Sequence, residues 1–242
     1  MIQRLHNHLS RVRRDEGGFG LLELLVAFGI FSILAVVVIS GFSGFTATMI
    51  KDQIATRNTN VAAVGMNEMT RVIRAATTIP QQNAEDLPAF VFANKEKITL
   101  YAFIDTSSGV PAPVKVQFEV KTWKGEPRVL TETRWLAHPK AGAPSYWEFD
   151  TVFTERVIAR SIVTPTGTQA SLFNYQEINP TTLNPVDLAL PSGGMAAANL
   201  KKIAVVEVTI KVQTDPAARA AAVLITNQVG IPNLGVSRLS LS

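Results

Sequence analysis

The chain has 242 residues, of which 47% are hydrophobic and 17% are charged, so its composition excludes disorder over most of its length. With no cysteine and three histidines, two of them in the first eight residues, it excludes disulfides, cysteine nucleophiles and metal sites built from thiolates or histidine clusters. Four arginines in the first 14 residues supply much of the formal net charge of +4, so this charge does not indicate a nucleic-acid-binding surface.

An uncharged and largely apolar run occupies residues 24–50. It is longer than the roughly 20 residues that a helix needs to cross a hydrocarbon core. It is also longer than the apolar core of a cleavable secretory signal, which is about 7–15 residues. Basic residues precede the run, so we expect a single-pass membrane helix with a cytoplasmic N-terminus and an extracytoplasmic C-terminal part.

One acidic residue, Glu23, stands at the entrance of this run. A carboxylate carried into a membrane is costly, and such residues are usually functional or paired. Glu23 can instead remain at the headgroups or favour the positive end of the helix dipole. Taken alone, Glu23 leaves both interpretations open.

The residues around Glu23 carry a recognisable pattern. Residues 17–25 read GGFGLLELL and follow a basic segment. This pattern resembles the class III signal of type IV pilins and type II secretion pseudopilins. The resemblance implies cleavage between Gly18 and Phe19, N-methylation of Phe19, and a role in assembly for Glu23 as the fifth residue of the mature chain. Gly20 departs from the usual threonine or serine, and the leader of 18 residues is longer than in major pilins.

The same resemblance implies a set of partners. A prepilin peptidase, which in many systems is also the methyltransferase, would process the chain. The Glu23 carboxylate would then face the N-terminal ammonium of a neighbouring subunit. We expect further contacts with other minor pilins or pseudopilins, with the inner-membrane assembly platform and with membrane lipid; a nucleic-acid partner is not supported.

The helical character continues beyond the apolar run. Proline is absent from the segment before Pro80, so nothing forces a break between Phe19 and about Ile79. Apolar residues recur at helical spacing and predict a buried face that includes Ile54, Val61, Val64, Met69 and Ala76. We therefore expect an amphipathic continuation of the helix over residues 51–79.

From residue 87 the apolar pattern changes to a period of two, which is typical of strands. The sequence predicts strands near 89–93, 98–104, 114–120, 128–135, 154–159, 171–175, 201–213 and 221–229. We expect a hairpin between the third and fourth strands and antiparallel pairing of the last two. Loops are expected around 105–113, 138–145 and 178–199.

The predicted fold is α+β, with a long N-terminal helix packed on an antiparallel, sandwich-like β head. Four parts follow: a leader over 1–18, a membrane and assembly helix over 19–50, its amphipathic continuation over 51–79, and an extracytoplasmic head over 80–242. The order of elements in the head resembles the larger minor pilins, the PilW-like proteins, and the type II secretion pseudopilin J.

The head offers little catalytic chemistry. His138 is the one histidine there and is expected in a loop, and no phosphate-binding glycine motif occurs. A calcium site near Asp105 or Asp187 stays open, although neither loop has dense carboxylate spacing. Three tryptophans, at 123, 135 and 147, are more typical of cross-strand packing than of a ligand platform. We expect no enzyme activity and no cofactor.

The sequence therefore predicts a minor pilin or pseudopilin that is built into a type IV pilus or a type II secretion pseudopilus, most simply in an initiating or capping position. The alternative is an uncleaved, membrane-anchored extracytoplasmic binding domain in which Glu23 is incidental.

Overall fold

The computed structural model describes residues 20–81, 85–105, 112–140, 142–166, 170–191 and 193–234. The chain divides into two compact units, Met1–Lys51 and Asp52–Ser242. Gly18 and Phe19, the predicted cleavage site, lie outside the described residues.

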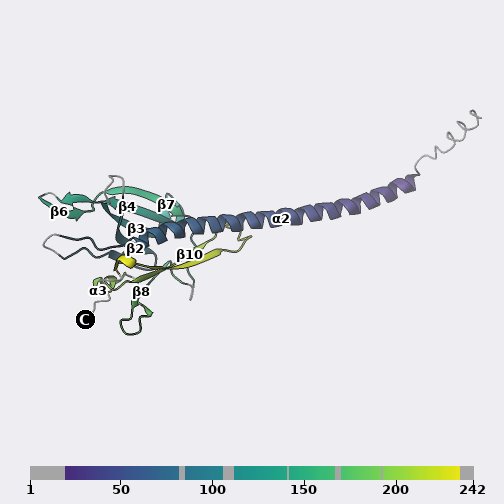
Figure 1. Ribbon diagram of the computed structural model, residues 1–242. Helices are drawn as coiled ribbons and strands as arrows, with labels where there is room; N and C mark the ends of the chain where they lie inside the picture. The colour runs from purple at the N-terminus through teal and green to yellow at the C-terminus, as the bar shows by residue number, and fades with distance from the viewer. Residues whose placement is uncertain are drawn as a thin grey trace, which may run out of the picture. The chain divides into compact units, whose positions relative to one another are not determined.

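Helix α2, Leu21–Arg74, runs from the first unit into the second (Figure 1). Glu23 lies in its first turn, and Arg71 and Arg74 lie in its last, which complements the helix dipole at both ends. The helix ends at Arg74 rather than near Ile79. After it, Thr77 donates a backbone hydrogen bond of 3.0 Å to Tyr101, and Ile79 forms a β-bridge with Leu87. Pairing with strand backbone therefore replaces the last predicted helical turn.

The head contains two main sheets (Figure 1). The first is antiparallel in the order β1-β2-β3-β4-β7, with bounds Phe90–Ala93, Lys97–Asp105, Ala112–Trp123, Glu126–Leu136 and Val152–Ala159. The second is antiparallel in the order β11-β10-β8-β9, with bounds Val223–Gly230, Val205–Val212, Phe173–Ile178 and Pro185–Asp187. The predicted α+β fold is confirmed.

Both predicted hairpins are present. Strands β3 and β4 pair across a turn at Lys124 and Gly125, whose φ angles of 49° and 85° are those that a tight two-residue hairpin turn requires. Strands β10 and β11 pair from Val205 opposite Gly230 to Val212 opposite Val223. Alternate residues of β3 and β10 are buried, as the period-two pattern predicts.

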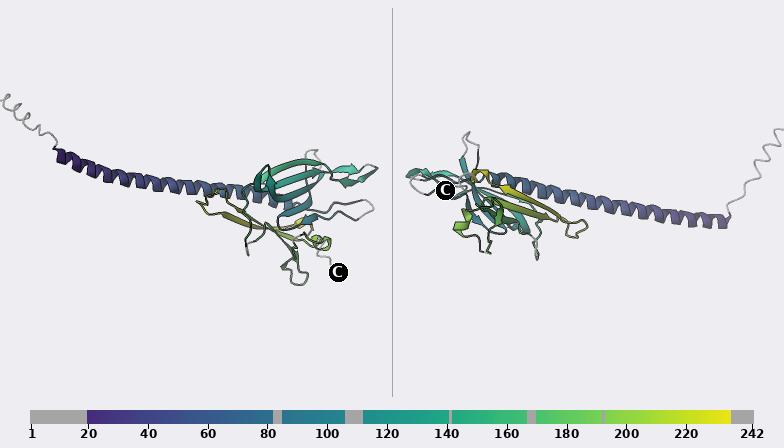
Figure 2. Two further views of the ribbon diagram at one scale, coloured as in Figure 1. Left: turned by 180° about the vertical axis from the view of Figure 1, so that it is seen from behind. Right: turned by 60° about the horizontal axis from the view of Figure 1, so that its bottom comes forward.

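The two sheets lie on opposite sides of the part of α2 formed by residues 52–74 (Figures 1 and 2). A Cβ atom on Gly65 would lie 3.0 Å from the Cβ of Ala159 in the first sheet and 3.1 Å from the Cδ1 of Ile210 in the second. Glycine therefore permits a close approach of the helix to both sheets at this position.

The buried face of α2 differs in part from the predicted one. Its buried residues are Asn58, Ala62, Gly65, Met66, Met69, Val72 and Ile73. Val64 was predicted on this face and is 61% exposed. Val64 precedes Gly65 by one residue, so its side chain points about 100° away from the face that both sheets cover.

Two predicted loops contain regular structure. Residues 138–145 include β5, His138–Lys140, and the start of β6, Ala143–Glu148, which form a small two-stranded sheet. Residues 178–199 include β9 and most of α3, Ala197–Leu200. These elements are three to six residues long, which is too short for periodicity to identify them.

Candidate functional site

Glu23 closes the first turn of α2. Its Oε2 accepts a hydrogen bond of 3.2 Å from the backbone N–H of Gly20, the residue immediately before the helix. Gly20 in turn accepts the backbone bond from Leu24. A glutamate at the third helical position that bonds back to the N-cap N–H is the acidic half of a capping box. The carboxylate therefore satisfies one free N–H of the helix N-terminus, as the helix-dipole interpretation of Glu23 expects.

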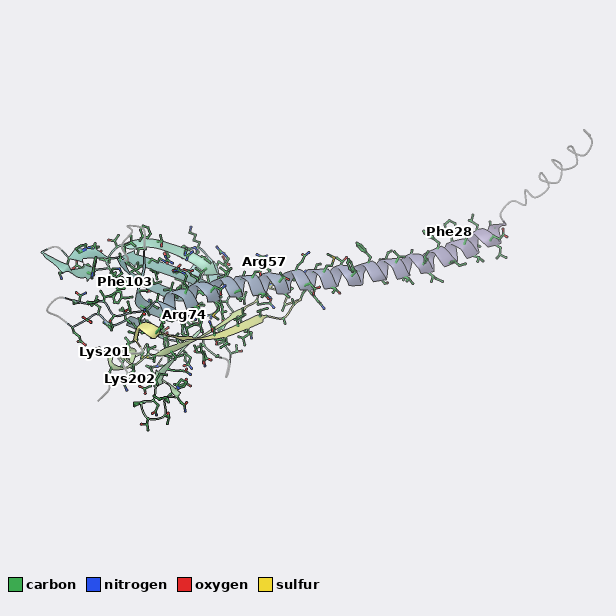
Figure 3. All side chains as sticks on the ribbon, in the orientation of Figure 1. Phe28, Arg57, Arg74, Phe103, Lys201 and Lys202 are labelled. Carbon is green, nitrogen blue, oxygen red and sulfur yellow. The ribbon has the colours of Figure 1, made fainter. Side chains whose placement is uncertain are left out.

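The first part of α2 carries a continuous apolar surface. Its large side chains are exposed from Leu21 through Phe45, and Phe28, labelled in Figure 3, is 60% exposed. Within the described residues, α2 is the one helix long and apolar enough to cross a membrane. Exposed hydrocarbon on this scale requires an apolar environment or other helices of the same kind.

A charged cluster in the head was missed by the sequence prediction. It joins Glu68, Arg71, Glu132, Arg134 and Arg156. Glu132 is fully buried, and its two carboxylate oxygens lie 2.7 Å from Arg134 Nε and 2.6 Å from Arg156 Nε. Glu68 on α2 accepts bonds from Arg71, Arg134 and Arg156 at 2.6, 2.8 and 2.7 Å. The cluster therefore ties the helix to β4 and β7.

The three arginines of the cluster favour the ionised form of Glu68 on α2. Partial burial opposes ionisation of Glu68, but the hydrogen bond and charge of Arg71, with the charges of Arg156 and Arg134, hold the pKa of that carboxyl below its ordinary value. The sequence spacing does indicate one contact of this cluster, because Glu132 and Arg134 are two residues apart and share one face of a strand. Their contact with Glu68 depends on the tertiary fold.

A second polar anchor lies at the fully buried Asn58 of α2. Its amide nitrogen is 3.2 Å from Gln213 Oε1 and 3.2 Å from the carbonyl of Ala221. Its oxygen accepts bonds from the backbone N–H and the hydroxyl of Thr214, at 2.8 and 2.7 Å. Asn58 thereby holds the connection between β10 and β11 against the helix.

His138 lies in β5 rather than in the expected loop. Its Nε2 is 2.6 Å from Asp150 Oδ1, and this hydrogen bond raises the pKa of the imidazole. Glu148 is near both residues and pairs with Lys140 at 3.3 Å. His138 and Asp150 are exposed and Glu148 is half-buried. The two pairs, His138 with Asp150 and Lys140 with Glu148, are best explained as ion pairs that hold the β5–β6 hairpin.

The other residues considered for binding have structural partners. Trp135 lies opposite Lys115 and Trp123 lies opposite Glu126, so these two tryptophans do not face one another. Lys115 Nζ is 4.5 Å from the ring centre of Trp135. Asp187 accepts bonds from Asn174 and Gln176, and the side chain of Asp105 lies outside what the structure describes.

Residues 13–39 match the family model described as the prokaryotic N-terminal methylation motif. No curated protein matches the chain. The match includes the predicted cleavage site, Glu23 and most of the exposed apolar surface. The chain therefore carries a type IV pilin-like class III signal, which supports processing by a prepilin peptidase, anchoring in a membrane and assembly with pilins.

Proposed function

We propose that the chain is a non-enzymatic minor pilin or pseudopilin that initiates or caps a type IV pilus or a type II secretion pseudopilus. One observation carries this proposal: the methylation motif of residues 13–39 leads directly into α2, which continues into a β-rich head. Cleavage after Gly18 would leave this helix in the mature protein, whereas ordinary signal cleavage after the apolar run would remove it.

The geometry of Glu23 is compatible with a role in assembly. One carboxylate oxygen bonds to Gly20 within the same helix, and an ionised carboxylate has room for about three further donors. In an apolar environment an uncompensated charge is unfavourable, and an ammonium group from a neighbour relieves that cost. The methylated N-terminus of Phe19 in an adjacent subunit is the partner we propose.

The minor role is supported by the head. Its two main sheets flank the helix on opposite sides. The order of elements expected from the sequence resembles that of the larger minor pilins and pseudopilin J. A bulky head is tolerated more easily at the end of a filament, where neighbours are few, than at every position along a shaft. The non-enzymatic assignment is supported by the surface pairing of His138 and by the structural partners of Asp187.

Immunoelectron microscopy with antibodies to the head, applied to filaments from cells that produce the chain, tests this function. We expect label at one end of the filament for the unmodified chain. Glu23→Ala should be processed but little incorporated into filaments. Gly18→Leu should not be processed. The conservative variant Glu23→Asp serves as a control for the helix cap. Uniform label along the shaft would contradict the initiating or capping role, and normal incorporation of Glu23→Ala would contradict the charge-pairing role.

A further inference from the structure

A groove runs along the surface of the head between α2 and β7. It consists of two adjoining hollows with volumes of about 370 and 360 Å³, which share Val64, Val157 and Ile158 as lining residues. We call it the basic groove. Its charged lining residues are Arg57, Glu68, Arg71, Glu126, Arg156 and Arg160.

The floor of the basic groove exposes apolar surface on an otherwise polar stripe of the helix. Val64 is 61% exposed, and Arg57, Asn60, Asn67 and Arg71 follow the same face of α2 at spacings of three and four residues. Val157 on β7 is half-buried beside it. Val64 and Val157 together give the groove an apolar floor beneath the charged rim.

The rim of the groove is positively charged. Its lining contains four arginines against two glutamates. The side chains of Arg71, Arg156 and Arg160 are each 52% exposed although each contacts a glutamate. Arg57 forms no ion pair with any residue that the structure describes. A guanidinium has five donors, so an arginine that already binds one carboxylate retains N–H groups for a second.

The wall of the groove that β7 forms is an open sheet edge. β7 is the last strand of the five-stranded sheet and pairs with β4 alone among the strands described. The backbone groups on its other side point away from the sheet, and such an edge is a template for an added strand. An extended segment that paired with β7 would lie over Val64 and between the arginines of the two walls.

We propose that the basic groove binds an extended acidic segment of a partner protein as an additional strand on β7. Alternate apolar side chains of that segment would contact Val64 and Val157, and its carboxylates would bind the arginines. A single-stranded nucleic acid fits less well, because no aromatic residue lines either hollow to stack on its bases. This inference stands apart from the proposed function, since any partner with such a segment would satisfy it.

Fluorescence anisotropy with the full chain in detergent tests the proposal. The probe is a labelled, acetylated ten-residue peptide of alternating valine and glutamate, and the matched peptide has glutamine in place of glutamate. We expect saturable binding of the acidic peptide, about tenfold weaker binding of the glutamine peptide, and a similar loss for the double variant Arg57→Glu, Val64→Glu. Lys202→Glu reverses one positive charge, as Arg57→Glu does, at a site away from α2 (Figure 3) and is expected to leave binding unchanged.

Amide hydrogen exchange of the same complexes reports on the added strand. We expect slower exchange in β7 when the acidic peptide is bound, and no such change in the double variant. Absence of saturable binding, equal binding of the two peptides, or unchanged exchange in β7 would overturn the proposal. Tighter binding of a single-stranded oligonucleotide, lost in the same double variant, would also overturn it in favour of a nucleic-acid surface.

Discussion

Glu68 on α2 and Arg134 on β4 are joined by a hydrogen bond of 2.8 Å although 66 positions separate them in the sequence. Arg134 also binds the buried Glu132, so one guanidinium connects the helix with the interior of the first sheet. Charged groups taken out of water must be paired, and removal of one leaves the others uncompensated. The stability of the head should therefore depend strongly on this cluster.

Replacement of Glu132 by alanine is expected to lower the free energy of unfolding of the head by about 3 kcal/mol, because it leaves Arg134 partly buried without its carboxylate. Urea unfolding followed by tryptophan fluorescence measures this, since Trp123, Trp135 and Trp147 all lie in the head. Glu155→Ala removes a partly exposed partner of Lys121 and should cost less than about 1 kcal/mol. Equal losses for the two variants would contradict the account.

The lowered pKa of Asp215 predicts that the head loses stability in acid. Hydrogen bonds from the side chain and backbone of Arg219 lower the pKa of Asp215 from 3.8 to about 2. A carboxyl whose pKa is lower in the folded state stabilises above its unfolded pKa, and this contribution disappears as the pH falls through the folded value. Asp215→Asn should therefore flatten the dependence of stability on pH between about 4 and 2. An unchanged slope in acid unfolding curves would argue against the pair.

Glu68 should contribute in the same direction, because its pKa is also below the ordinary value. Its contribution is complete above the unfolded pKa and is lost as the carboxyl becomes protonated on acidification. We expect Glu68→Gln to be less stable than the wild type at pH 7 and to approach it in acid. A stability difference that stays constant with pH would contradict this interpretation.

The close approach at Gly65 predicts strong sensitivity to size. Gly65→Leu should destabilise the head by about 2 kcal/mol, since the new side chain would meet Ala159 and Ile210. Val64→Leu, at the exposed neighbouring position, should change stability by less than about 0.5 kcal/mol. Thermal unfolding of the two variants compares an overpacked site with an exposed one, and similar midpoints would refute the contact.

Asn58 is expected to act as a buried polar anchor. Asn58→Ala leaves the carbonyl of Ala221 and the N–H of Thr214 without this partner and should cost about 2 kcal/mol. Asn60→Ala removes an exposed amide one half-turn away and should cost little. Hydrogen exchange should also be faster in the connection between β10 and β11 in Asn58→Ala alone; no difference between the variants would disprove the anchor.

Long periodic segments were the most predictable part of this fold. The apolar run and the absence of proline predict α2, and alternation in β3 and β10 predicts their buried faces. The buried face of α2 was harder to predict, because hydrophobicity favours burial of Val64 and gives no reason to bury Asn58. Asn58 is buried since Thr214 and Ala221, distant in sequence, satisfy its amide. Tertiary partners of this kind leave no periodic signal.

The candidate site likewise has one part that local sequence indicates and one part that depends on the tertiary fold. Glu23 and its glycine-phenylalanine context form a local motif, so the sequence alone indicates them, and the matched family model covers the same residues. The cluster around Glu68 and Glu132 and the basic groove arise where α2 meets β7. Their members are separated by tens of residues, and no local spacing brings them together.

The mass and N-terminal sequence of the protein extracted from membranes of its producing cells test the central claim most directly. A prepilin-type substrate should yield a mature chain that begins at Phe19, carries one added methyl group on its α-amine and retains α2. Gly18→Leu should preserve the full-length mass. A wild-type chain that keeps its leader, or one that is cleaved after the apolar run, would contradict the account.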